Sequence, residues 1–254
     1  MSAKYANTIG RLQEMGKGSG GGAGPRGNSS RGLSKPSGHL DPGLLERPNV
    51  NISASDLQAA EDFFGQGSLS KEFIGALTNG VDGGDVSVIH QDGELLLSTW
   101  HNGVRARRTI SRIKGELVAK NEIFTIADDS PYKGHGTEML ASQVIALKAA
   151  GVVKIKTTAA GHAKSQGKWN GYYTWARAGY DGKIPAKTWR KLPSGLKRQM
   201  GTSRSVQDLM SKAGGKEAWK QHGAQFQGTF NTRDGSRSMK VLQAYVAERA
   251  SRGK

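Results

Sequence analysis

The fold is decided by residues 128 to 161, DDSPYKGHGTEMLASQVIALKAAGVVKIKTTAAG. Two glycines one residue apart, Gly134 and Gly136, open a segment whose apolar residues recur at helical spacing and predict an amphipathic helix. Gly151 ends that helix, and the β-branched run VVKIKTTA after it predicts a buried strand. The apolar stripe of the predicted helix is formed by Met139, Leu140, Val144 and Leu147.

Upstream of this stretch the sequence predicts two helices and then four strands. ISASDLQAAEDFFGQG begins with Ser53 or Ser55 as a candidate N-cap and has Asp56 in its first turn, and SKEFIGALTNG predicts a second, shorter helix. Turns of the sequence QDG, HNG and KG separate four segments rich in β-branched residues: VSVIH, ELLLSTW, VRARRTISRI and ELVAKNEIFTIAD. The expected fold class is α/β or α+β, with a mixed, mostly antiparallel sheet flanked by helices.

Beyond residue 185 the sequence predicts basic, mainly helical structure. Proline and glycine break KTWRKLPSGLKRQM, SVQDLMSKAGG and KEAWKQHG into short helices, and AQFQGTFNT is a candidate strand. The last helix has Ser236 or Asp234 as its cap, and one face of it carries Val241, Leu242, Tyr245 and Val246. We expect residues 186 to 254 to form a C-terminal subdomain that packs on the sheet.

Residues 1 to 50 differ from the rest of the chain in composition. Residues 16 to 50 are rich in Gly, Ser and Pro and poor in aromatic residues, which predicts a flexible tail. Ahead of them, AKYANTIGRLQEM predicts a short helix that could dock on an assembly partner, because its apolar residues have roughly helical spacing. These apolar residues are Tyr5, Ile9, Leu12 and Met15. The folded part is expected to begin near residue 51.

The composition excludes several classes of function. None of the 254 residues is cysteine, so disulfides, thiolate metal sites and a cysteine nucleophile are impossible, and the six histidines show no metal-ligand spacing. No apolar run approaches the roughly 18 residues that a membrane span needs, so we expect no membrane partner and a cytoplasmic location.

The net charge of +16 is unevenly distributed along the chain. Residues 51 to 100 contain one Lys or Arg and eight Asp or Glu residues. Residues 101 to 200 contain nineteen Lys or Arg and six Asp or Glu residues. A basic surface attracts nucleic acid and small ligands that carry phosphate. A solvated basic face with no such partner would explain the same counts.

The two glycines at the helix start have two interpretations. A helix N-terminus has unpaired N–H groups and a partial positive charge, and Gly134 and Gly136 would let a phosphate approach them. Lys133 would add a cation at the same place. Alternatively, the glycines only shape a tight turn between a strand and a helix.

The run from Asn121 to Asp181 resembles the GNAT-type N-acetyltransferase superfamily. The resemblance rests on Gly134-His135-Gly136 with Leu140 behind them, on Gly151, and on Gly179-Tyr180 after the aromatic segment KWNGYYTWAR. It implies a GNAT-like domain over residues 51 to 185, acetyl-CoA as co-substrate, and transfer of its acetyl group to an amine of a protein or small molecule. The donor contacts that it implies are Ile126, Ala127, Lys133, Gly134, His135, Gly136, Thr137 and Asn170.

Two residues depart from the family's pattern. Pro131 replaces the Gln or Arg that precedes the glycines, and Trp175 stands where a tyrosine general acid is frequent. Tyr173 or Tyr172 then becomes the candidate acid for the departing thiolate, and Glu122 becomes the candidate base. Glu122 could equally be a solvated charge on a strand edge.

Two functions stay open. The first is an acyl-CoA-dependent N-acetyltransferase, which the intact helix start favours. The second is a catalytically inactive GNAT-like structural or virion-assembly protein with a basic surface adjacent to nucleic acid. The two departures, the tail and the charge favour this second function. NGYYTWARAGYD and the later GSRS helix are similar to GNAT-like domains of phage virion and phage-associated proteins, which adds the virion as an expected location.

Overall fold

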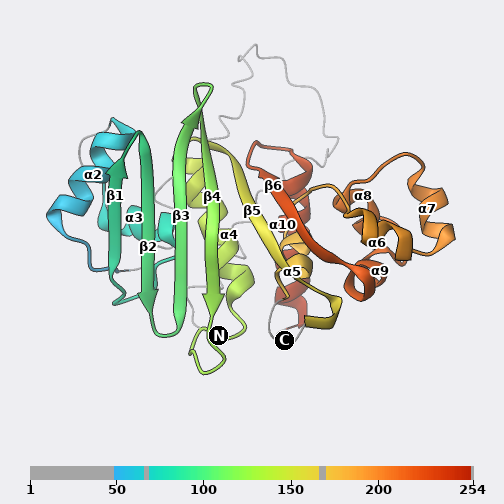
Figure 1. The fold of residues 1–254 in the computed structure, drawn as a ribbon. Coiled ribbons are helices and arrows are strands. Elements are labelled where there is room, and N and C mark those ends of the chain that lie inside the picture. Colours follow the sequence, from blue (N-terminus) through green and yellow to red (C-terminus); the bar gives the residue numbers. More distant parts are fainter. Residues whose placement is uncertain (1–48, 66–68, 166–169, 253–254) are drawn as a thin grey trace, which may run out of the picture.

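A computed structural model describes residues 49–65, 69–165 and 170–252 (Figure 1). The expected fold class is confirmed: the chain forms a mixed, mostly antiparallel six-stranded sheet flanked by helices. The predicted tail and its candidate docking helix lie outside the described residues, except for Asn49 and Val50. Within the described ranges, no helix has both the length and the apolar character that crossing a membrane requires.

The six strands follow one another across the sheet in the order of the sequence. The first four form the predicted antiparallel meander, the fifth runs parallel to the fourth, and the sixth is antiparallel to the fifth. A parallel pair needs a crossover connection, and the helix α4 (Gly136–Ala149) provides it. The strands are β1 (Val86–Gln91), β2 (Glu94–His101), β3 (Val104–Ile113), β4 (Glu116–Ile126), β5 (Val152–His162) and β6 (Ala224–Asn231).

The helices of the first half begin and end at the capping residues and the glycine that the sequence indicates. Ser53 caps α2 (Ala54–Phe64), since its side chain accepts a hydrogen bond from the Asp56 N–H at 3.1 Å, and Ser70 caps α3 (Lys71–Thr78) in the same way. The whole predicted apolar stripe of α4 (Gly136–Ala149) is buried. Gly151 follows with φ +82°, in the left-handed region that lets the chain leave the helix.

Helices cover one face of the sheet (Figure 1). The main core lies between that face and helices α2, α3, α4 and α10 (Arg237–Arg252). In the part of the chain that the structure describes, no helix lies over the opposite face, which we call the uncovered face. The strands therefore alternate between buried and more exposed residues: in β3, Val104, Ala106, Arg108 and Ile110 are buried, and the residues between them are not.

The C-terminal segment, predicted as one subdomain that packs on the sheet, contains a group of short helices followed by a strand and a long helix. Residues 186–222 form a small helical lobe beside β6 (Figure 1). Its buried side chains pack around Trp219 together with Ala159, Tyr172 and Phe226 from outside the lobe. By contrast, β6 joins the main sheet through alternate buried residues such as Phe230, and α10 packs Leu242 and Val246 into the main core. The lobe consists of α6 (Ala186–Lys191), α7 (Ser194–Met200), α8 (Val206–Met210) and α9 (Gly215–His222).

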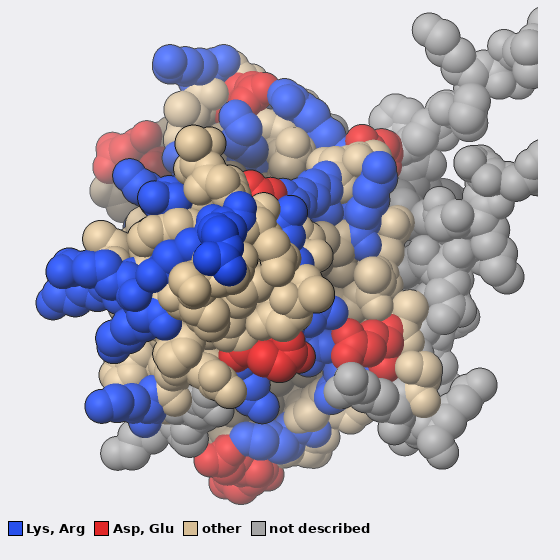
Figure 2. Space-filling view, turned by 90° about the vertical axis from the view of Figure 1, so that its right-hand side faces the viewer, with Lys and Arg blue, Asp and Glu red and all other residues tan. Residues whose placement is uncertain are grey.

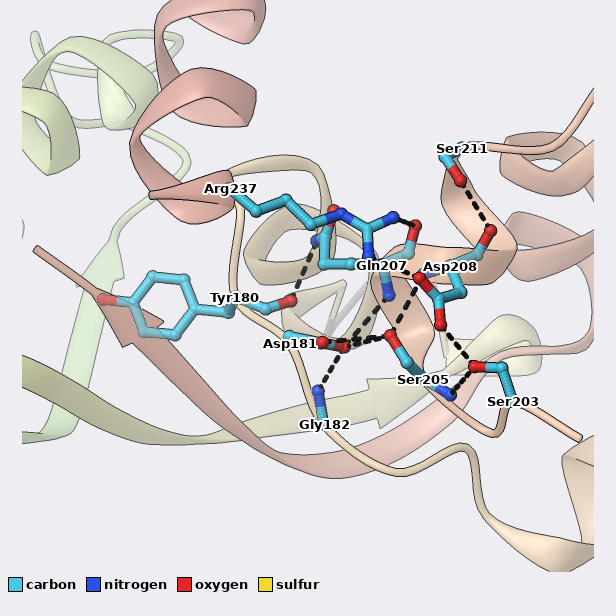
Figure 3. A network of polar contacts seen from close by, with 9 residues as sticks. All are labelled: Tyr180, Asp181, Gly182, Ser203, Ser205, Gln207, Asp208, Ser211 and Arg237. Carbon is cyan, nitrogen blue, oxygen red and sulfur yellow. Dashed lines mark hydrogen bonds and ion pairs between the residues drawn. The ribbon is translucent and has the colours of Figure 1, made fainter. Parts of the chain in front are cut away.

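A polar network joins the lobe to the main core (Figure 3). The Asp181 carboxylate accepts hydrogen bonds from Ser205 Oγ at 2.8 Å and from the Gln207 N–H at 3.1 Å. Gln207 Nε2 donates to the Tyr180 carbonyl at 2.9 Å, and Arg237 of α10 donates to the Gln207 carbonyl at 2.7 Å. The start of α8 is thus fixed to the turn at Tyr180 and to the last helix.

Stability in acid should depend on Asp208 in this network. Hydrogen bonds from Ser203 Oγ and then from Arg237 lower the pKa of the Asp208 carboxyl below its ordinary value of 3.8. A lowered folded-state pKa adds stability that is present above the unfolded pKa and is lost as pH falls through the folded one. We therefore expect Asp208→Asn to be less stable than wild type at pH 6, with the difference shrinking below pH 3.8.

Urea unfolding between pH 3 and pH 7 measures this difference. Ser203→Ala removes the hydrogen bond that lowers the pKa of Asp208 most. It should therefore show part of the loss of stability at pH 6 that is expected for Asp208→Asn. A difference that stays constant over this pH range would contradict the role of Asp208.

Candidate functional site

The parallel strands β4 and β5 separate partway along their length. Their pairing runs from Leu117 and Val152 to Asn121 and Thr157 and then stops, although β4 continues to Ile126. From residue 122 to residue 126, the edge of β4 that faces β5 has no strand partner among the described residues. An unpaired strand edge is able to form hydrogen bonds with another extended chain.

The start of α4 lies at the end of β4 where the strands separate. A β-carbon added at Gly136 would be 3.4 Å from Ile126 Cδ1, which places the first helical residue against the last residue of β4. The connecting loop is held on the β2–β3 turn, because the Ala127 N–H donates to the Gly103 carbonyl at 2.8 Å and Ser130 Oγ donates to the Asn102 carbonyl at 2.6 Å.

The helix start is open and its first donors have no acceptor. Gly134 has φ +90°, which favours glycine, and no atom lies within 4 Å of where its β-carbon would be. The first hydrogen bond of the helix runs from the Met139 N–H to the His135 carbonyl at 3.0 Å. The N–H groups of residues 136, 137 and 138 have no acceptor within the part of the chain that is described. The glycines therefore shape a tight turn, and the first three N–H groups of the helix stay unpaired among the described residues, with Gly136 half-buried and Thr137 and Glu138 buried.

Charged side chains surround this helix start. The Lys133 ammonium pairs with Asp128, and this hydrogen bond lowers the pKa of the Asp128 carboxyl. Arg249 of α10, an exposed residue that the sequence did not single out, donates to the Gly134 carbonyl at 3.0 Å. Glu138 in the first turn is buried, and among the described residues its Oε2 has no hydrogen-bond partner. A negative charge at this position interacts favourably with the helix dipole, but it would repel a bound anion.

The two candidate tyrosines differ in their surroundings. Tyr172 is fully buried, and its hydroxyl donates to the Lys220 carbonyl at 2.8 Å inside the lobe. Tyr173 is half-buried, and the Arg177 guanidinium lies 5.8 Å from its ring centre. Burial raises the pKa of Tyr173, partly offset by Arg177, so the phenol keeps its proton at neutral pH. That is the state in which a tyrosine can act as a general acid.

The last helix connects Tyr173 with the start of α4. The helix α5 (Gly171–Arg177) carries Arg177, which donates to Glu248 of α10 at 2.7 Å and stacks on Tyr245 at 4.3 Å. The next residue of α10 is Arg249, which reaches Gly134. The sequence predicts this helix, but these contacts join residues too far apart along the chain for a local pattern to show them.

Glu122 lies at an irregularity of β4. Arg107 of β3 pairs with Ile123 whereas Arg108 pairs with Asn121, so Glu122 is the extra residue of a β-bulge. Its carboxylate is 2.8 Å from Arg107 Nε and 3.7 Å from Lys120 Nζ, both on the uncovered face. Tyr173 belongs to α5, which packs on the helix-covered face through Tyr172 and Ala176 against Ala159 and Phe226. The structure therefore places the candidate acid and base on opposite faces of the sheet.

The remaining residues singled out from the sequence lie around α5. Asn170 is the N-cap of α5, and its Oδ1 accepts a hydrogen bond from Thr174 Oγ1 at 3.3 Å. Trp175 makes an edge-on contact with Tyr180 at 4.8 Å between ring centres and lies 6.4 Å from Phe124 of β4. Packing between α5 and β4 thus accounts for an indole at this position. Pro131 is exposed in the loop before α4.

A buried polar cluster next to the site was missed in the sequence. Arg108 is fully buried and donates to the Leu77 carbonyl at the end of α3. When the Gln143 amide is turned so that its oxygen faces Arg108, that oxygen accepts from both guanidinium nitrogens at 2.9 and 3.2 Å. Asn121 Nδ2 donates to the Tyr180 hydroxyl at 3.3 Å. Burial lowers the pKa of Arg108 to about 9.

Comparison with known proteins identifies no relative of this chain. No protein-family model matches the sequence, and neither a curated protein nor a solved structure shows significant similarity to it.

Proposed function

We propose that the protein is an acyl-CoA-dependent N-acetyltransferase that acetylates an amine of a protein or small molecule. One observation carries the proposal: β4 and β5 separate after Asn121 and Thr157, and a helix start with three N–H groups that lack acceptors among the described residues lies at that end. This combination offers an anion site beside a strand edge that can pair with an extended ligand.

The two features suit different parts of an acyl-CoA molecule. The N–H groups of residues 136 to 138 would bind its diphosphate, and the exposed Arg249 guanidinium next to them would add positive charge. The unpaired edge of β4 would form hydrogen bonds with the two amide groups of the pantetheine arm. These contacts support acetyl-CoA as the ligand, while the carboxylates of Glu138 and of Asp128, which is paired with Lys133, oppose its negative charge.

Transfer would proceed by direct attack. The amine nitrogen forms a bond to the thioester carbonyl carbon, the carbon–sulfur bond breaks, and the thiolate takes a proton. Tyr173 is the candidate donor of that proton, because its raised pKa keeps it protonated. Glu122 is the candidate acceptor of the amine's proton, on the other face of the sheet. A ligand lying between the separated strands would be exposed to both faces, and most of the rate would come from proximity.

Calorimetric titration of the full chain with acetyl-CoA tests the donor site. We expect micromolar binding by wild type and a loss of at least 100-fold in Gly136→Glu, because a carboxylate at this helix start repels the diphosphate. The substitution suits the helix itself, since acidic residues stabilise a helix N-terminus.

Gly136→Ala is the matched control. Its β-carbon would meet only Ile126 Cδ1 at an ordinary distance of 3.4 Å, so it should bind acetyl-CoA as wild type does. Wild-type protein that is folded and does not bind acetyl-CoA would refute the donor site.

Acetyl transfer is then measured by the release of CoA thiol. The chain contains no cysteine, so a thiol reagent reports only the product. A lysine peptide and a polyamine represent the two classes of acceptor. The structural or virion-assembly function stays a prediction, because its main element, the tail, lies outside the described residues.

A further inference from the structure

The uncovered face of the sheet carries an unusual set of side chains. Most of its residues are polar or charged, and its most exposed large apolar side chain is aromatic. Across β2 to β5 it presents Glu94, Leu96, Ser98, Trp100, Arg105, Arg107, Thr109, Ser111, Ile113, Glu116, Lys120, Glu122, Ile123, Thr125, Lys154, Lys156 and Thr158.

Trp100 is the largest exposed apolar side chain within the described residues. It is 77 % exposed, although an indole of this size is usually mostly buried. Its cross-strand partner is Arg105, and the partner of Arg105 on β4 is Thr125. The indole therefore projects from the sheet at the position opposite Arg105, with most of its surface open to solvent and to a planar ligand.

Positive charges outnumber negative ones on this face. It has five Lys or Arg residues and three carboxylates. Glu122 already pairs with Arg107 and Lys120, Glu116 pairs with Lys154, and Glu94 lies at the far end of β2 from Trp100. Lys120 and Lys156 are direct cross-strand partners, an arrangement of like charges that weakens a sheet unless an anion lies between or above them. Arg105 and Lys156 have no ion-pair partner among the residues that the structure describes.

We propose that the uncovered face binds single-stranded nucleic acid, with a base stacked on Trp100 and the phosphates along Arg105, Lys120 and Lys156. Exposed aromatic residues on a flat sheet stack with unpaired bases, and flanking cations neutralise the backbone. A duplex would contact the cations only, because its bases are already stacked inside the helix. The proposal does not depend on acetyl-CoA binding.

Another occupant of the uncovered face, and another surface for nucleic acid, are both less favoured. The first 48 residues of the chain could cover the face, but they carry seven Lys or Arg and three Asp or Glu, so charge does not favour them there. The lobe is a second basic surface, where Lys and Arg outnumber Asp and Glu (Figure 2). However, the ring of Trp189 in the lobe is covered by the Arg204 guanidinium, 3.6 Å from its centre.

Titration of the full chain with a 20-nucleotide oligo-dT, followed by tryptophan fluorescence and by anisotropy of labelled DNA, tests the proposal. We expect wild type to bind with quenching of tryptophan fluorescence, and to lose affinity with a slope of about −2 in log K against log salt for three neutralised phosphates. Trp100→Ala should lower affinity about tenfold and remove most of the quenching, whereas Trp100→Phe should retain most of the affinity.

A pair of double variants with the same loss of charge distinguishes the face from the lobe. Arg105→Gln with Lys156→Gln should make the salt slope less steep by about 1.4, in proportion to two lost phosphate contacts. Lys187→Gln with Lys191→Gln, both on exposed positions of α6, should leave the slope almost unchanged. The proposal is overturned if wild type does not bind at 50 mM salt, if duplex binds as tightly as oligo-dT, or if only the α6 pair reduces binding.

Discussion

Replacing Arg108 with alanine is expected to lower the free energy of unfolding by about 3–5 kcal/mol. The guanidinium is fully buried, so its removal leaves a cavity in the core. It also leaves the Leu77 carbonyl and the Gln143 amide oxygen without their donor, and each buried acceptor without a partner costs about 1–3 kcal/mol. Leu77 depends on this donor because it lies in the last turn of α3, where carbonyls have no partner within the helix.

Arg105→Ala is the matched control for this prediction. It removes the same side chain from the same strand, but Arg105 is exposed on the other face of the sheet, so the change should stay within about 0.5 kcal/mol. Urea unfolding of both variants at pH 7 measures the difference. Similar losses from the two substitutions would show that the buried cluster does not contribute the stability assigned to it.

The Arg108 cluster also has a consequence for the candidate site. Asn121 lies at the last paired position between β4 and β5, and the bulge at Glu122 begins directly after it. Gln143 of α4 contacts Asn121 from the helix side at 2.7 Å. The cluster therefore fixes the point where the two strands separate and positions the crossover helix, so we expect Arg108→Ala to weaken acetyl-CoA binding as well.

Much of the fold follows from patterns that lie within single segments. The turns after β1, β2 and β3 and the alternation of the strands predict the meander, and Ser53 and Gly151 mark helix ends through their capping chemistry. The same alternation places Arg108 on the buried side of VRARRTISRI with Ala106 and Ile110. This signal in the sequence could have revealed the buried cluster.

The parts that the sequence did not show depend on long-range contacts. Arg249 and Gly134 are 115 residues apart, and nothing near either residue indicates that they meet. The return of β6 and α10 to the main core depends on pairing with β5, which a local pattern cannot distinguish from a separate subdomain. The bulge at Glu122, after which Ile123 faces the same side as Glu122, arises from a shift in register between two strands.

Gly179→Ala is expected to lower the free energy of unfolding by about 3 kcal/mol. Gly179 has φ +97° and ends α5 in a Schellman motif, in which the Tyr180 N–H donates to the Trp175 carbonyl at 3.1 Å and the Gly179 N–H donates to the Ala176 carbonyl at 3.2 Å. A β-carbon there would be strained by the backbone conformation. It would also lie 2.5 Å from the carbonyl oxygen of Ser238 in α10.

Relief of this clash requires α10 to move away from α5, since the contacting atom belongs to backbone. Gly195→Ala is the control: no atom lies within 4 Å of the added methyl group, and the residue is inside α7, so this variant should gain about 0.5–1 kcal/mol. Thermal and urea unfolding of the two variants measure these opposite shifts. A Gly179→Ala variant as stable as wild type would show that α10 does not pack against the end of α5 as described. The contact between Arg249 of α10 and Gly134 at the start of α4 would then also be wrong.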